Sequence, residues 1–186
     1  MAAVAVAAAG GLAYYLVVTG KLTLDTGLGR QTRGLGPFGI DIEAPAETVF
    51  DVIAAPYLRR TPRAMAGKLR VLDRGADLVL AEHYTPLHGG RLTAVTLETV
   101  SFDRPGRIAF RLVRGPVPHL TEEFKLITRD GVTRLDYSGE LGTDFGAAGR
   151  YWADRVAAAW EAAVRSSFAG IKSEAERRAS GGHAPA

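Results

Sequence analysis

The hydrophobic pattern changes its period within the stretch G-P-F-G-I-D-I-E-A-P-A-E-T-V-F-D-V-I-A, residues 36–54. Up to Glu43, apolar and polar residues alternate, which is the period of a half-buried β-strand. After Pro45, a residue suited to the first turn of a helix, apolar residues recur at helical spacing through Ile53. The pattern therefore predicts that the folded domain opens with a strand followed by a helix.

Six further strand-like runs follow a Pro-bounded helical turn at residues 56–65. Segments rich in Gly, Pro, Asp and Arg separate these runs, which is the chemistry of tight turns. Because such short turns join strands that run in opposite directions, neighbouring strands are expected to pair antiparallel. The predicted strands cover residues 68–73, 77–85, 91–102, 107–114, 119–127 and 133–141.

The last segment, from Phe145 to about Arg178, has the pattern of a long amphipathic helix. Roughly 33 residues make a helix about 50 Å long, enough to cross a whole sheet. A seven-stranded antiparallel sheet buries its apolar face by curling around such a helix. We therefore predict an α+β helix-grip fold, with two short helices after the first strand. The apolar stripe of the last helix comprises Trp152, Val156, Trp160, Val164, Phe168 and Ile171.

The chain begins with a run, residues 2–20, that carries no charge and is mostly apolar. At the helical rise this run spans roughly 28 Å, so we expect a single membrane anchor at residues 1–20. The run lacks a preceding positive segment, which favours an uncleaved anchor over a signal peptide that would export the domain. A core helix is the third alternative. Lys21, Arg30 and Arg33 follow the run, so the domain is expected to face the cytoplasm.

The remaining segments complete the predicted domain layout. Residues 21–36 are interpreted as a Gly-rich tether, because their glycines do not fit the G-x-G-x-x-G phosphate loop. The folded domain is assigned to residues 37–178 and a disordered tail to residues 179–186. The 186-residue chain has a net charge of only +3 and no cysteine, so we expect no nucleic-acid binding, no disulfides and no thiol chemistry.

The opening motif I-D-I-E-A-P-A-E-T-V-F-D-V-I-A, the six-strand meander and the final Trp-containing helix resemble the START-like superfamily. This superfamily, also written SRPBCC, includes polyketide cyclase/dehydrase and lipid-transport proteins. The resemblance extends through about Arg178 and implies a deep hydrophobic cavity between sheet and C-terminal helix. It also implies that the cavity binds lipids, sterols, polyketides or other apolar ligands, and a minority of members catalyse cyclisation or hydrolysis there. A membrane span departs from most members, and no catalytic constellation transfers residue by residue.

Strand alternation selects three candidates for acid–base chemistry. Glu98 and Glu122 share a face with apolar neighbours, so both carboxylates are expected to point inward, where one could have a raised pKa. His83 is a candidate proton shuttle. The structural alternatives are that each glutamate pairs with an arginine such as Arg111 or Arg114, or meets water at the open end of the sheet. For His83 the alternative is an ordinary strand residue.

The expected cavity wall combines these groups with aromatic and apolar residues of several elements. On the run 107–114, Ile108, Phe110 and Leu112 are expected to face the core, although Ala109 and Val113 form an alternative inward face. The predicted lining consists of Tyr57, Met65, Tyr84, Glu98, Phe110, Glu122, Phe124, Tyr137, Trp152, Val156 and Trp160.

Three functions stay open at this point. The first is a membrane-tethered domain that binds a hydrophobic small molecule or lipid. The second is a cyclase or aromatase acting on a polyketide-like substrate, with Glu98, Glu122 or His83 transferring the proton. The third is a protein-interaction module with a filled interior. No cofactor or metal is expected, because H-x-H and H-E-x-x-H are missing, and no G-x-S-x-G motif supports a serine hydrolase.

Overall fold

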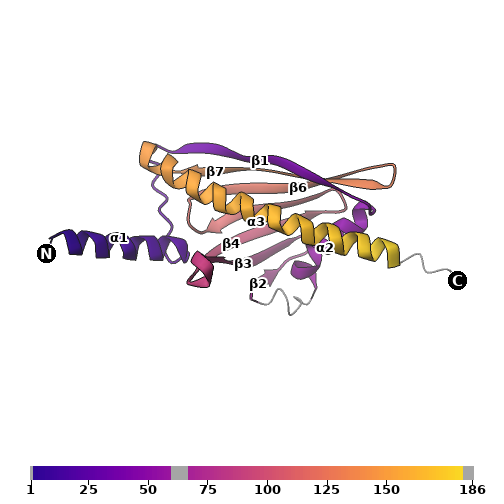
Figure 1. Cartoon of the computed structure of the whole chain (residues 1–186), viewed down its shortest axis with the longest axis horizontal. Coiled ribbons are helices and arrows are strands. Elements are labelled where there is room, and N and C mark those ends of the chain that lie inside the picture. The colour runs from indigo at the N-terminus through magenta and orange to yellow at the C-terminus, as the bar shows by residue number, and fades with distance from the viewer. Residues whose placement is uncertain (1, 60–66, 182–186) are drawn as a thin grey trace.

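The computed structural model describes residues 2–59 and 67–181. Seven strands form one antiparallel sheet in the order β1-β7-β6-β5-β4-β3-β2, and helix α3 (Gly146–Gly181) lies across one face of it (Figure 1). This arrangement confirms the predicted α+β helix-grip fold. A short turn, η2 (His88–Gly90), joins β3 to β4. The strands are β1 (Gln31–Ile42), β2 (Leu69–Arg74), β3 (Leu78–Leu87), β4 (Leu92–Asp103), β5 (Arg107–Arg114), β6 (His119–Arg129) and β7 (Val132–Thr143).

Helix α2 (Ala46–Leu58) follows β1, as the change of hydrophobic period predicts. Pro56, where the pattern starts a second short helix, lies inside α2. The helix tolerates it because Pro56 is in the last turn, where the Arg59 amide still donates to the Ala55 carbonyl at 3.0 Å. The rest of the predicted turn, including Met65, lies outside the described residues. The buried face of α2 includes Val49, Phe50 and Ile53.

The hydrophobic core lies between the sheet, α3 and α2. On β5 the side chains of Ile108, Phe110 and Leu112 are buried, whereas Arg111 and Val113 are exposed. The face that carries Ile108, Phe110 and Leu112 is therefore the inward one, and the alternative face with Val113 is not. From α3, Val156 and Phe168 are buried in this core, and Trp152, Trp160, Val164 and Ile171 pack against it. Helix α3 continues to Gly181, into the segment predicted as a tail.

Helix α1 (Ala2–Val18) occupies the segment predicted to be a membrane anchor and extends beyond one end of the sheet (Figure 1). Its 17 residues measure about 26 Å at the helical rise, less than the roughly 30 Å of a hydrocarbon core. Within residues 2–59 and 67–181, no helix is both long enough and apolar enough to cross a membrane. The predicted span at residues 1–20 is therefore not supported.

The segment between α1 and β1 is fastened to the domain, and we call residues 19–30 the strap. The buried Asp144 carboxylate accepts hydrogen bonds from the amides of Thr26 at 2.6 Å and Gly27 at 2.8 Å, and from Nε of Arg30 at 2.7 Å. The Arg30 guanidinium and these amides hold the pKa of Asp144 well below its usual range, so the carboxylate stays charged at neutral pH. The predicted Gly-rich tether is thus part strap and part strand, since β1 begins at Gln31.

Candidate functional site

A cavity of about 530 Å³ lies between the sheet and α3, and we call it the deep cavity. Strands β3 to β6 and helix α3 supply most of its wall, and one residue of α2 and two residues of α1 also line it. A polar cluster, consisting of Tyr57, His83, Glu98 and Glu122, faces into this space. The apolar wall includes Phe110, Phe124, Trp152, Val156, Trp160 and Val164. An apolar cavity with a few convergent polar groups is typical of a small-molecule site.

His83 and Glu98 form an ion pair between adjacent strands. In the β3–β4 ladder His83 lies opposite Thr96, two positions before Glu98, so the inward side chains of the two strands are diagonal neighbours. Nδ1 of His83 is 3.2 Å from Oε2 of Glu98, an ion-pair distance without the angle of a hydrogen bond. Oγ1 of Thr96 donates to Oε1 of Glu98 at 2.5 Å. The partner of Glu98 is therefore a histidine of the same cavity and not an arginine.

This pairing favours the charged form of both partners. Burial raises the pKa of Glu98, but the charge of His83 and the hydrogen bond from Thr96 outweigh it, and the net pKa is lowered. Burial lowers the pKa of His83, but the Glu98 carboxylate outweighs this effect, and the net pKa is raised. The lowered pKa of Glu98 and the raised pKa of His83 both indicate that a His83 imidazolium faces a Glu98 carboxylate.

Tyr57 reaches the pair from the last turn of α2. Its hydroxyl oxygen is 2.9 Å from Nε2 of His83. When His83 is protonated, Nε2–H donates to the Tyr57 oxygen, which leaves the phenolic proton for another acceptor. Burial, together with the charges of Glu98 and Glu122, raises the pKa of Tyr57, so the phenol stays a neutral hydrogen-bond donor.

Glu122 on β6 is the second polar centre of the cavity. Its Oε2 accepts hydrogen bonds from the Tyr137 hydroxyl at 2.7 Å and from Nε1 of Trp160 at 2.6 Å. Gly139 lies opposite Glu122 in the β6–β7 ladder, and a Cβ at position 139 would come within 2.9 Å of the Glu122 Cβ. Glycine therefore leaves the space that the Glu122 side chain needs. From the part of the chain that the structure describes, Oε1 of Glu122 receives no hydrogen bond.

The two carboxylates of the cavity differ in protonation. Burial and the neighbouring charge of Glu98 raise the pKa of Glu122 to about 7, although its donors Tyr137 and Trp160 act in the opposite direction. Glu122 is only 8% exposed and Glu98 only 2%, so burial alone does not separate them. The difference is the His83 counter-charge beside Glu98. The cavity thus holds one fixed ion pair and one carboxyl group that titrates near neutrality.

The structure places most of the predicted lining residues at the cavity surface. The prediction that Tyr84 lines the cavity is wrong, because alternation along β3 gives the inward position to His83. The Tyr84 hydroxyl instead donates to Oε2 of Glu82 at 2.6 Å. Tyr137 is fully buried behind Glu122 and supports that carboxylate. Met65 lies outside the described residues. The predicted residues at the surface are Tyr57, His83, Glu98, Phe110, Glu122, Phe124, Trp152, Val156 and Trp160.

Several wall residues escaped the sequence reasoning. Thr96 and Thr85 share inward faces with Glu98 and His83, so strand alternation alone could have identified them. Tyr14 and Val18 of α1 also line the cavity. No periodic signal connects these two residues to the sheet, because α1 is apolar on all sides and shows no preferred face in its sequence.

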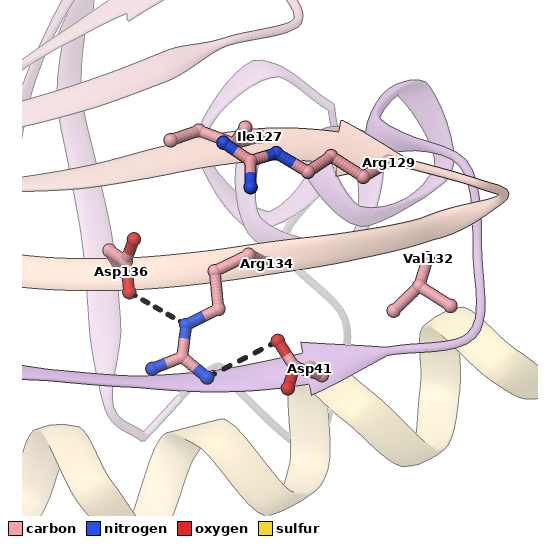
Figure 2. A pocket seen from close by; sticks show the side chains of 6 residues that line it. All are labelled: Asp41, Ile127, Arg129, Val132, Arg134 and Asp136. Atoms are coloured by element: carbon pink, nitrogen blue, oxygen red, sulfur yellow. Dashed lines mark hydrogen bonds and ion pairs between the residues drawn. The ribbon is translucent and has the colours of Figure 1, made fainter.

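A hollow of about 360 Å³ lies on the outer face of β1, β6 and β7, turned away from α3 (Figure 2). There Arg134 lies between two acids, with Nε 2.9 Å from Asp136 and Nη1 3.2 Å from Asp41. These charges are exposed and compensate one another, so the hollow offers no group with unusual chemistry. Among residues 2–59 and 67–181, no group of three or more His, Asp or Glu side chains is placed to hold a metal ion.

Several solved structures share this fold. The aromatase/cyclase ZhuI from Streptomyces sp. R1128 has a TM-score of 0.62 and 18% identity, over 80% of this chain and 96% of that chain. Truncated norcoclaurine synthase from Thalictrum flavum has a TM-score of 0.61 and 12% identity, over 81% and 96%. TTHA0849 from Thermus thermophilus has a TM-score of 0.60 and 17% identity, over 77% and 97%. At such identities the similarity concerns the fold alone.

The amino-acid sequence shows the family to which the chain belongs. No curated protein sequence matches the chain at a significant level. The family model described as polyketide cyclase / dehydrase and lipid transport matches residues 39–176, which begin within β1 and end in the last turns of α3. The match spans well over half of the 186 residues and contains the whole polar cluster of the cavity. The chain therefore belongs to the polyketide cyclase/dehydrase and lipid transport family.

Proposed function

We propose that this protein binds an apolar small molecule carrying one hydroxyl or carbonyl group, in the deep cavity. The observation that carries the proposal is the cavity itself, about 530 Å³ of mostly apolar space with a polar cluster facing into it. An interaction module with a filled interior would not leave such a space.

The polar cluster determines which chemical group suits the site. Glu98 and His83 compensate each other, so a ligand meets mainly the Tyr57 hydroxyl and Oε1 of Glu122. Tyr57 donates to a ligand oxygen, and Glu122 accepts from a hydroxyl when ionised or donates to a carbonyl when protonated. The aromatic wall contacts the rest of the ligand, and the apolar area buried there supplies most of the affinity.

A natural ligand is expected to remain on the full chain when the protein is purified from its own host. Native mass spectrometry followed by organic extraction should find one apolar ligand per chain. In Ala163→Trp the indole occupies cavity space beside Val164, and we expect ligand occupancy to fall by roughly tenfold or more. Ala162→Trp is the control, because both alanines are exposed but only Ala163 lines the cavity. Equal occupancy in the two variants would contradict the proposal.

A second candidate function is proton transfer on a ketone held in the same cavity. The observation that favours it is the Glu122 pKa of about 7 beside a neutral phenol donor, since a base is most effective near its operating pH. In this step a C–H bond next to the ligand carbonyl breaks, its proton passes to Glu122, and the resulting enolate oxygen accepts a hydrogen bond from Tyr57. Enolate formation of this kind begins aldol-type cyclisations.

The proton-transfer candidate is tested with 2-tetralone, an apolar ketone, by following deuterium exchange at C1 with NMR. We expect the wild-type chain to exchange deuterium faster than buffer alone does. Glu122→Gln should reduce the protein-catalysed exchange rate by roughly 100-fold or more. Glu140→Gln, on the outer surface, should keep the wild-type rate. An equal rate in wild type and Glu122→Gln would exclude Glu122 as the base.

A further inference from the structure

The N-terminal helix completes the deep cavity although it lies outside the family match. That match begins at residue 39, whereas α1 ends at Val18. Tyr14 and Val18 nevertheless line the cavity, and Val18 is only 3% exposed. Part of the wall is therefore supplied by a segment that precedes the domain shared with the family.

The position of α1 against the domain is fixed by the strap. Gly20 adopts φ of 66°, and a Cβ there would lie 2.5 Å from the Val95 carbonyl oxygen, so only glycine permits this close approach to β4. Thr23 Oγ1 then donates to the Gly115 carbonyl at 2.9 Å. The Asp144 carboxylate holds the rest of the strap. These contacts determine where Tyr14 lies.

A second apolar pocket of about 330 Å³, the outer pocket, lies on the other side of Tyr14 and Trp152. Tyr14, Pro116 and Trp152 line both spaces and form the partition between them. Nε1 of Trp152 donates to the Pro116 carbonyl at 2.8 Å, so the indole is held in place. The Tyr14 ring meets it edge to face, with ring centroids 6.0 Å apart. The rest of the outer pocket includes Ala13, Val17, Leu24, Phe145, Ala148 and Gly149.

We infer that Tyr14 determines the length of the ligands that the deep cavity accepts, by closing the passage to the outer pocket. This inference rests on the proposed function, since it concerns ligands of the same cavity. Trp152 and Pro116 belong to the domain that the family match covers, and Tyr14 of α1 supplies the third part of the partition. Removing its ring joins the two apolar spaces. An extended apolar tail can then pass from the deep cavity into the outer pocket.

The test uses 4-alkylphenols of increasing chain length, which displace the neutral fluorophore N-phenyl-1-naphthylamine from the full chain. In the wild type each added CH2 should lower Kd by about fourfold until the alkyl chain fills the deep cavity, after which the gain stops. In Tyr14→Ala the fourfold gain per CH2 should continue through several further carbons. Tyr14→Phe keeps the ring and should keep the wild-type limit.

Two further variants make the result specific. Ala148→Trp fills the outer pocket from an exposed position, so Tyr14→Ala/Ala148→Trp should return to the wild-type length limit. Leu12→Ala, at a residue of α1 that is 59% exposed and lines neither space, should behave as wild type. An identical length limit in wild type and Tyr14→Ala would overturn the inference. Undiminished binding of the fluorophore to Ala163→Trp would instead overturn the proposed function, because the ligand would then lie elsewhere.

Discussion

Between pH 4.5 and pH 7 the wild-type protein is expected to lose about 3 kcal/mol of unfolding free energy that Glu122→Gln does not lose. The pKa of Glu122 is raised from 4.5 to about 7 in the folded protein. In the unfolded chain the carboxyl group ionises near 4.5, so above that pH unfolding releases a proton and stability falls. The loss is complete above pH 7, where the group is ionised in both states. Glutamine has the same shape and does not titrate.

Urea denaturation of both proteins at pH 4.5, 5.5 and 7.5 measures this effect, because the other titrating groups cancel in the difference. Glu123→Gln is a matched control from the next residue. Arg107 and Lys125 lower the pKa of Glu123, so its stabilisation is present above the unfolded pKa and is lost as pH falls. The difference in unfolding free energy between wild type and Glu123→Gln should therefore change with pH in the opposite direction. Parallel pH profiles for wild type and Glu122→Gln would mean that Glu122 ionises normally.

Glu98→Gln is expected to lower the unfolding free energy by about 3 kcal/mol at pH 6, because it leaves the His83 imidazolium in the cavity wall without its counter-charge. The raised pKa of His83 means that its stabilisation is complete below the unfolded pKa of 6.5 and is lost as pH rises through the folded value. The lowered pKa of Glu98 means that its stabilisation is present above 4.5 and is lost as pH falls. The loss of unfolding free energy in Glu98→Gln should therefore be greatest between pH 4.5 and pH 6.5.

The chain offers a matched control for this pair. His119 and Glu140 also lie 3.2 Å apart, but their side chains are 36% and 51% exposed. Glu140→Gln should change the unfolding free energy by less than about 0.5 kcal/mol, since exposed ion pairs contribute little. Unfolding by urea at pH 6 and pH 8.5 distinguishes the two sites. Equal costs for Glu98→Gln and Glu140→Gln, or a cost for Glu98→Gln that is larger at pH 8.5, would contradict the assignment.

Strand alternation was a reliable guide wherever one face of a strand is apolar throughout. On β5 and β6 it correctly aimed Phe110, Glu122 and Phe124 inward, because a period of two leaves no intermediate orientation. The same rule explains why the prediction that Tyr84 lines the cavity was wrong. His83 and Tyr84 are adjacent, so only one of the two side chains can face the cavity. The register with β4 makes the choice, and it selects His83.

Contacts between distant elements were beyond prediction from the sequence. One alternative for the cavity carboxylates was a pairing with an arginine such as Arg114, but the Arg114 guanidinium lies 3.6 Å from Glu82 on the outer face. Glu98 instead meets His83, which depends on the pairing register of β3 and β4. The place of Tyr14 beside Trp152 depends on the strap and its buried Asp144, and a uniformly apolar helix gives no sign of which face will pack.

Equilibrium binding of N-phenyl-1-naphthylamine to the full chain shows whether the space between the sheet and α3 is a ligand site. Fluorescence titration of the wild type and Ala162→Trp should give saturable one-to-one binding with the same Kd. Ala163→Trp should bind roughly 100-fold more weakly, because the indole takes the apolar space that the fluorophore needs. The same Kd for all three proteins, or no saturable binding to the wild type, would contradict a ligand-binding cavity.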